Sequence, residues 1–131
     1  MSVWRPFLFG AGSVARVLVV DDDPAVLELL VGGLVALGHQ VQAARDGEQA
    51  REVLDAGGIE VLVTDLQMPR LDGLALLAHV RTSTNPIPTI VVSGSWTDAQ
   101  RQRARELGAA RLLAKPVELA QLARDVEELA R

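Results

Sequence analysis

The stretch VLVVDDDPAVLELL, residues 17–30, joins a short apolar run to three consecutive aspartates and to a helical pattern that starts at a proline. The stretch VLVTDLQMPRLDGLALL, residues 61–77, has the same design, with one aspartate directly after the apolar run. Apolar runs without polar alternation are typical of strands whose two faces are both covered. Each stretch therefore predicts a buried strand, a polar loop at its carboxyl end, and a helix that follows.

The alternation of strand and helix patterns continues outward from these two stretches over most of the chain. Strands are predicted at residues 16–20, 40–44, 59–64, 89–92 and 111–114, and helices at residues 24–37, 47–56, 73–81, 98–107 and 118–130. Five such alternations indicate an α/β fold in which a parallel sheet carries helices on both faces, joined by right-handed crossovers.

Length and composition favour one small domain. The chain has 131 residues, of which 49% are hydrophobic, enough to build a core. It contains no cysteine, which excludes disulfide bonds and a cysteine-ligated zinc site. The net charge of -4 argues against nucleic acid as a direct partner, since phosphate binding needs clustered positive charge. No apolar run approaches the ~20 residues of a membrane helix, so a soluble, cytoplasmic protein without membrane attachment is expected.

Residues 1–15 do not fit the alternating pattern. They hold Trp4, Phe7 and Phe9, three of the four aromatic residues in the chain. We expect an N-terminal extension over residues 1–15, either a docking arm or a disordered tail, and one domain over residues 16–131.

Polar side chains follow four of the five predicted strands. Asp21 and Asp22 follow the first strand, Asp65 the third, Ser93 the fourth and Lys115 the fifth. In an open parallel sheet, ligands bind beyond the carboxyl ends of the strands, so these side chains are expected at one edge. Lys115 is also the only lysine among 13 basic residues, the others being arginine, which favours a position that needs a compact ammonium group.

Other polar residues have structural interpretations. Asp23, which precedes a proline, is typical of a helix N-cap, and Asp72, which precedes a glycine, is typical of a turn and cap. His39 and His79 fall away from the strand ends and are predicted to be structural.

The three aspartates at the strand ends form a hard-oxygen site suited to Mg²⁺. The absence of histidine and cysteine among them disfavours zinc or copper. A hydroxyl and an ammonium group beside such a site indicate phosphoryl chemistry, in which metal and ammonium neutralise phosphoryl oxygens and a carboxylate attacks phosphorus.

From about Val14 to the C-terminus, the chain resembles the receiver domain of bacterial two-component response regulators. The resemblance rests on the acidic pair after the first strand, on the motif D-x-x-M-P-x-x-D-G from Asp65 to Gly73, and on the Ser-Gly and Lys-Pro pairs at residues 93–94 and 115–116. It implies a flavodoxin-like fold, a doubly wound five-stranded parallel sheet of strand order 2-1-3-4-5 with five helices.

The resemblance also implies a role for each residue of the site. Asp65 would be the phosphoacceptor, with Asp22 binding Mg²⁺ directly and Asp21 mainly through water. The other implied roles are the backbone carbonyl of Gln67 as a metal ligand, the hydroxyl of Ser93 as the switch, the ammonium of Lys115 as a phosphate contact, and a cis peptide bond before Pro116.

The function implied by the resemblance is that of a signalling receiver in a phosphorelay. Asp65 would take a phosphoryl group, with Mg²⁺, from the phosphohistidine of a sensor histidine kinase or phosphotransfer protein. The domain would then change its contacts with an unidentified downstream protein, through the fourth helix, fifth strand and fifth helix, or form a phosphorylation-dependent dimer. Its only catalysis would be its own Mg²⁺-dependent phosphorylation and dephosphorylation. The sequence ends after the fifth predicted helix, so we expect a stand-alone receiver or a fragment without its output domain.

Two other functions are possible for this pattern, and one residue departs from the pattern of the family. A silent receiver-like interaction module would not need all five polar residues. A Mg²⁺-dependent phosphohydrolase would need a cap domain and a second aspartate where Gln67 stands. Where the family often has an aromatic residue three positions before the lysine, this chain has Leu112. The usual coupling between hydroxyl and aromatic side chain cannot operate as such, so Leu112 moves less or the signal leaves by another surface.

Overall fold

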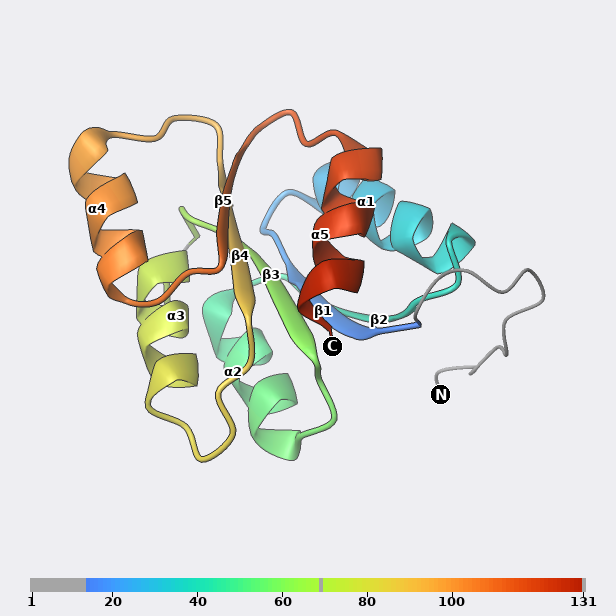
Figure 1. Cartoon of the computed structure of the whole chain (residues 1–131), viewed down its shortest axis with the longest axis horizontal. Helices are drawn as coiled ribbons and strands as arrows, with labels where there is room; N and C mark the ends of the chain where they lie inside the picture. The colour runs from blue at the N-terminus through green and yellow to red at the C-terminus, as the bar shows by residue number, and fades with distance from the viewer. Residues whose placement is uncertain (1–13, 69, 131) are drawn as a thin grey trace.

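Five short strands form one parallel sheet in the computed structural model, which describes residues 14–68 and 70–130 (Figure 1). The strand order is β2-β1-β3-β4-β5, and every pair of neighbours is parallel. The strands are β1 (Arg16–Val20), β2 (Gln40–Ala44), β3 (Val61–Asp65), β4 (Thr89–Ser93) and β5 (Arg111–Ala114). The doubly wound sheet implied by the resemblance is therefore confirmed, strand order included.

Five helices cover the two faces of this sheet. They are α1 (Pro24–Ala36), α2 (Gly47–Ala56), α3 (Gly73–Arg81), α4 (Asp98–Glu106) and α5 (Leu119–Leu129). α1 and α5 lie on one face, and α2 and α3 lie on the other (Figure 1). α4 lies beside α3, on the side of the molecule where β5 forms the edge of the sheet.

Successive side chains of each central strand alternate between two apolar layers. Val17 and Val19 of β1 belong to the layer formed with α1 and α5, whereas Leu18 and Val20 pack with Leu76 of α3. Since both faces are covered, β3 and β4 are buried along their whole length, which explains the lack of polar alternation in their sequences. The edge strand β5 is only half-buried.

Five of the ten elements have the predicted bounds, and the ends of β3, β4, α1, α4 and α5 differ from the predicted ends by one or two residues. The differences in β3 and β4 affect the site. β3 starts later than predicted, because Ile59 is buried in the preceding loop and therefore looks like a strand residue in the sequence. β3 also extends to Asp65, and β4 extends to Ser93. Asp65 and Ser93 are thus the last residues of two neighbouring strands.

Side-chain caps determine where the helices begin. Asp23 accepts hydrogen bonds from the N–H groups of Ala25 and Val26, and Asp72 accepts one from Ala75. Both interpretations as N-caps are confirmed. These caps fix the starts of α1 and α3, the helices that follow the two acidic loops.

Part of the expected organisation lies outside the described residues. Trp4, Phe7 and Phe9 of the expected N-terminal extension fall there, as does the proline at position 69 of the motif. Within the described region, Ala15 is already buried, and its N–H donates to Nδ1 of His39 at 3.0 Å. None of the helices in this region has the length and apolar character needed to cross a membrane.

Gly73 approaches the main chain at the end of β3. A Cβ at this position would overlap the carbonyl oxygen of Asp65 and lie 2.9 Å from the Cα of Leu66. We therefore expect Gly73→Ala to lower the free energy of unfolding by ~1–3 kcal/mol in urea denaturation, because main-chain atoms must move to make room. In the control Gly32→Ala, the added Cβ has no neighbour within 4 Å, so α1 should gain about 0.5–1 kcal/mol. A Gly73→Ala protein as stable as the parent would contradict the close approach.

Candidate functional site

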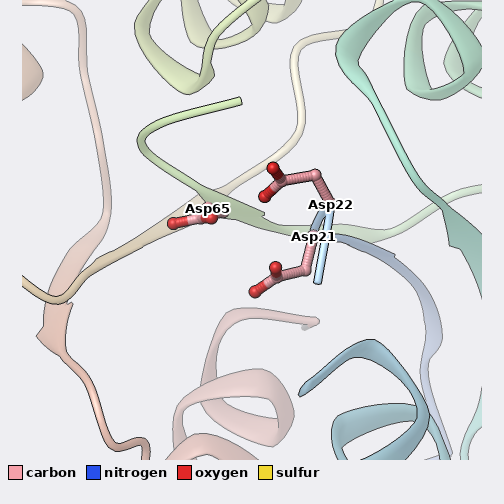
Figure 2. A group of neighbouring side chains, drawn as sticks. All are labelled: Asp21, Asp22 and Asp65. Carbon is pink, nitrogen blue, oxygen red and sulfur yellow. The ribbon is translucent and has the colours of Figure 1, made fainter. Parts of the chain in front are cut away.

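The carboxyl ends of β1 and β3 bring three aspartates together. The two strands are neighbours, with Asp21 directly after β1 and Asp65 as the last residue of β3. Figure 2 shows the carboxylates of Asp21, Asp22 and Asp65 close to one another at this edge of the sheet. One carboxylate oxygen from each aspartate lies within 4.8 Å of the others. An all-oxygen set of this kind can hold a hard cation.

The carboxylates of Asp21 and Asp22 differ in how many hydrogen bonds they accept from the protein. Asp21 is 2% exposed, its Oδ1 accepts the N–H of Asp23 at 2.9 Å, and its Oδ2 accepts a hydrogen bond from Nζ of Lys115 at 3.0 Å. Asp22 is exposed, and its carboxylate makes no hydrogen bond or ion pair with the described residues. Asp22 is therefore available to bind a cation directly, while both oxygens of Asp21 already have partners.

Lys115 connects the acidic cluster to the edge strand. It follows β5 directly, its N–H donates to the carbonyl of Ser93 at 2.9 Å, and its peptide bond to Pro116 is cis. Its Nζ lies 3.0 Å from Oδ2 of Asp21 and 3.3 Å from Oδ2 of Asp65. One ammonium group therefore bridges aspartates that come from two different strands.

The local charges change the proton affinities of the bridged groups. Burial raises the pKa of Asp65, and the carboxylate of Asp21 raises it further, while Lys115 offsets part of the rise. Burial alone would lower the pKa of Lys115, but its contacts with Asp21 and Asp65 outweigh burial and raise this pKa. Lys115 is therefore an ammonium ion at neutral pH. Three carboxylates face this single cation, which leaves negative charge that a divalent ion can offset.

Two further residues of the predicted site are Ser93, at the end of β4, and Gln67, on the loop after β3. Ser93 ends β4, is 1% exposed, and its Oγ accepts the N–H of Ser95 at 3.1 Å. It comes one position after Val92, which pairs with Asp65 across the sheet. Gln67 is exposed two residues beyond Asp65, and the role of its carbonyl stays a prediction.

The two histidines lie away from this edge of the sheet. His39 is buried, its Nδ1 accepts the N–H of Ala15, and its Nε2 lies 3.4 Å from a carboxylate oxygen of Glu127. His79 has its Nε2 2.9 Å from Oδ1 of Asp55 and lines a cavity of about 330 Å³ beside the amino ends of β3 and β4. No residue of the acidic cluster lines that cavity. Both histidines thus lie where a structural role was predicted.

An aromatic side chain that the sequence pattern did not assign to the site lies close to it. Trp96 follows Ser93 by three residues, and its indole N–H donates to the carbonyl of Leu113 in β5 at 2.8 Å. Its ring packs in an apolar cluster with Leu112, the residue at the altered switch position. The sequence offers one signal for this contact, because Trp96 is the only aromatic residue after Phe9.

Comparisons of sequence agree with this geometry. The chain matches the family described as "Response regulator receiver domain" over residues 17–127. The response regulator MprA of Mycobacterium ulcerans is 37% identical over 107 residues, which are 82% of this chain and 46% of MprA. The sensor histidine kinase RcsC of Salmonella typhimurium is 36% identical over 103 residues, which are 79% of this chain and 11% of RcsC. The chain thus spans less than half of the length of MprA.

A solved structure supports the same assignment. The signal receiver domain of the putative response regulator NarL from Mycobacterium tuberculosis matches with a TM-score of 0.81 and 30% identity, over 90% of this chain and 97% of that domain. The family match covers most of the chain, and both sequence relatives exceed 30% identity. With the strand order and the acidic cluster in agreement, the chain belongs to the receiver domain family of two-component response regulators, a family of signalling domains.

Proposed function

We propose that this receiver domain accepts a phosphoryl group on Asp65 from the phosphohistidine of a sensor histidine kinase or a phosphotransfer protein. The observation that carries the proposal is the position of the Asp65 carboxylate, 3.3 Å from the Lys115 ammonium and beside the carboxylates of Asp21 and Asp22. The site thus combines three groups that phosphoryl transfer needs. Asp65 is the nucleophile, Lys115 can contact a phosphoryl oxygen, and the neighbouring carboxylates can bind a metal ion.

The transfer exchanges one bond to phosphorus for another. A carboxylate oxygen of Asp65 forms a bond to phosphorus, while the bond between phosphorus and the imidazole nitrogen of the donor breaks. The leaving nitrogen keeps the electron pair, and the imidazole, protonated on its other nitrogen, departs neutral. In dephosphorylation, water attacks phosphorus, the bond between phosphorus and the Asp65 oxygen breaks, and inorganic phosphate leaves. The proposed chemistry is confined to this phosphorylation and dephosphorylation of the domain itself.

Mg²⁺ fits the oxygen donors at the carboxyl edge of the sheet. The proposed ligands are Asp22 and Asp65 directly, Asp21 mainly through water, and the backbone carbonyl of Gln67. When bound, the ion supplies positive charge for the phosphoryl oxygens. The open carboxylate of Asp22 and the two occupied oxygens of Asp21 support this division between direct and water-mediated ligands.

Lys115 and Ser93 are proposed to hold the phosphoryl group after the transfer. The Nζ of Lys115 already lies next to an oxygen of Asp65, and a compact ammonium contacts a phosphoryl oxygen as a point charge. The hydroxyl of Ser93 can donate one hydrogen bond to another phosphoryl oxygen once its side chain turns from the N–H of Ser95 toward Asp65.

The proposal concerns the domain and not a longer protein. Because the chain spans less than half of MprA, its downstream protein and a phosphorylation-dependent dimer stay predictions, as do the cytoplasmic location and the division of the chain between residues 15 and 16. RcsC is named a sensor histidine kinase and contains a stretch similar to this chain, which supports a kinase as the phosphoryl donor.

Asp65→Asn should abolish phosphorylation while the fold is kept, because the amide is nearly isosteric with the carboxylate but is not a nucleophile. Intact mass after incubation with Mg²⁺ and acetyl phosphate should show one added phosphoryl group on the parent and none on this variant. Asp23→Asn is the matched control, since asparagine also caps helices, and it should be labelled like the parent. Labelling of Asp65→Asn at the parental rate would reject Asp65 as the acceptor, and an unlabelled parent would favour the silent interaction module.

Mg²⁺ should raise the melting temperature of the parent, because it binds the folded state and relieves repulsion among the three carboxylates. At a concentration well above its dissociation constant, a rise of about 5 °C or more is expected in a thermal scan. Asp22→Ala should lose this rise, whereas Asp55→Ala, which removes an exposed carboxylate far from the cluster, should keep it. An unchanged response in Asp22→Ala would remove Asp22 from the metal site.

Without metal, the stability of the domain should depend on the ionisation of Asp65. Because folding raises the pKa of Asp65, the ionised carboxylate destabilises the fold above that pKa, and this cost is lost as the pH falls below the pKa of the unfolded chain. In urea denaturation with a chelator, Asp65→Asn should therefore be more stable than the parent at neutral pH, and the difference should shrink toward acid pH. A difference of the opposite sign at neutral pH would contradict the raised pKa.

A further inference from the structure

The helix α4 is attached to the domain by very little apolar surface. Of its residues, only Ala104 is buried, and most of the others are polar or charged. A helix that buries so little gains little stability from packing, and such elements open at low cost. The contacts that hold α4 in place must therefore come in large part from outside the helix.

Trp96, two residues before α4 begins, supplies several such contacts. Its indole N–H donates to the carbonyl of Leu113 in β5 at 2.8 Å. Its ring packs against the same buried apolar cluster as Leu107 and Leu112. The guanidinium carbon of Arg101, on α4, lies 5.6 Å from the centre of the Trp96 ring, within the range of a cation–π contact. A single side chain thus touches both the edge strand and the polar helix.

The loop that carries Trp96 is also connected to the proposed phosphorylation site. Ser93 is buried, and its Oγ accepts the N–H of Ser95, the residue directly before Trp96. If the hydroxyl of Ser93 turns toward an oxygen on Asp65, its Oγ moves away from that N–H. The main chain next to Trp96 then loses the contact that fixes it.

We propose that Trp96 is a latch that couples Ser93 to α4. With Ser93 bonded to Ser95, the latch is closed and Trp96 holds α4 against β5. With the Ser93 hydroxyl turned to a phosphoryl oxygen on Asp65, the latch opens and α4 is released. The proposal rests on the phosphorylation of Asp65 proposed above. It assigns the coupling to an aromatic residue on the loop after β4, in a chain that has Leu112 at the β5 position where the family often has an aromatic residue.

The closed latch is tested without phosphorylation by amide hydrogen exchange in the full chain. Trp96→Phe keeps an apolar ring but cannot donate to the carbonyl of Leu113. We expect the amides of α4 to exchange about fivefold faster in this variant than in the parent, the effect of losing one neutral hydrogen bond. The amides of α1 are the internal control and should be unchanged. Equal exchange of α4 in parent and variant would overturn the latch.

The opening of the latch is tested in a Trp4→Phe background, in which Trp96 is the only tryptophan. With Mg²⁺ and acetyl phosphate, intact mass should show the added phosphoryl group, Trp96 emission should shift to longer wavelength as the ring becomes exposed, and α4 exchange should accelerate about fivefold. Ser93→Ala in this background removes the acceptor for Ser95, so its emission should already be shifted before phosphorylation and should change little afterwards.

The outcomes separate this inference from the proposed function. A phosphorylated parent whose Trp96 emission and α4 exchange stay unchanged overturns the coupling and leaves the phosphorylation of Asp65 intact. A parent that gains no mass contradicts the proposed function and, with it, the trigger of the latch. In that case the resting exchange of Trp96→Phe still decides whether Trp96 holds α4.

Discussion

The contact of one ammonium group with two carboxylates is the constraint on which the functional edge depends. Asp21 is buried, and a buried carboxylate is costly unless an opposite charge and hydrogen bonds compensate it. Lys115 supplies that charge to Asp21 and to Asp65 at the same time. Because parallel strands end at the same edge of the sheet, the ammonium group that follows β5 reaches carboxylates at the ends of β1 and β3, and the burial of Asp21 depends on this ammonium group.

The fold and the acidic cluster could be predicted from the sequence because each depends on local patterns. Strands buried on both faces are continuous apolar runs, and the helix caps at Asp23 and Asp72 are recognisable from single residues and their successors. The strand order itself came from the resemblance to a family. The predicted start of β3 was two residues too early. Ile59 is apolar because it is buried, and an apolar residue before a strand cannot be told from a strand residue by sequence alone.

The contacts of Trp96 could not be predicted, since they join segments that the sequence does not relate. The acceptor of its indole N–H is a main-chain carbonyl of β5, which carries no signature in the sequence, and a carbonyl is presented by every residue. The bridging contacts of Lys115 could not be predicted from the sequence either. Its presence at the site followed from its position after a strand, but its simultaneous contact with Asp21 and Asp65 required the folded chain.

The half-buried edge strand β5 has a consequence for how samples of this protein are handled. β5 has a neighbouring strand on one side only, and Lys115 at its end is attached to the same carboxylates that a cation would use. Cation occupancy and the attachment of this strand are therefore thermodynamically linked. Preparations made with a chelator and preparations made with a divalent salt will therefore differ in how firmly β5 is attached. The buffer must be stated whenever the resting state of this protein is described.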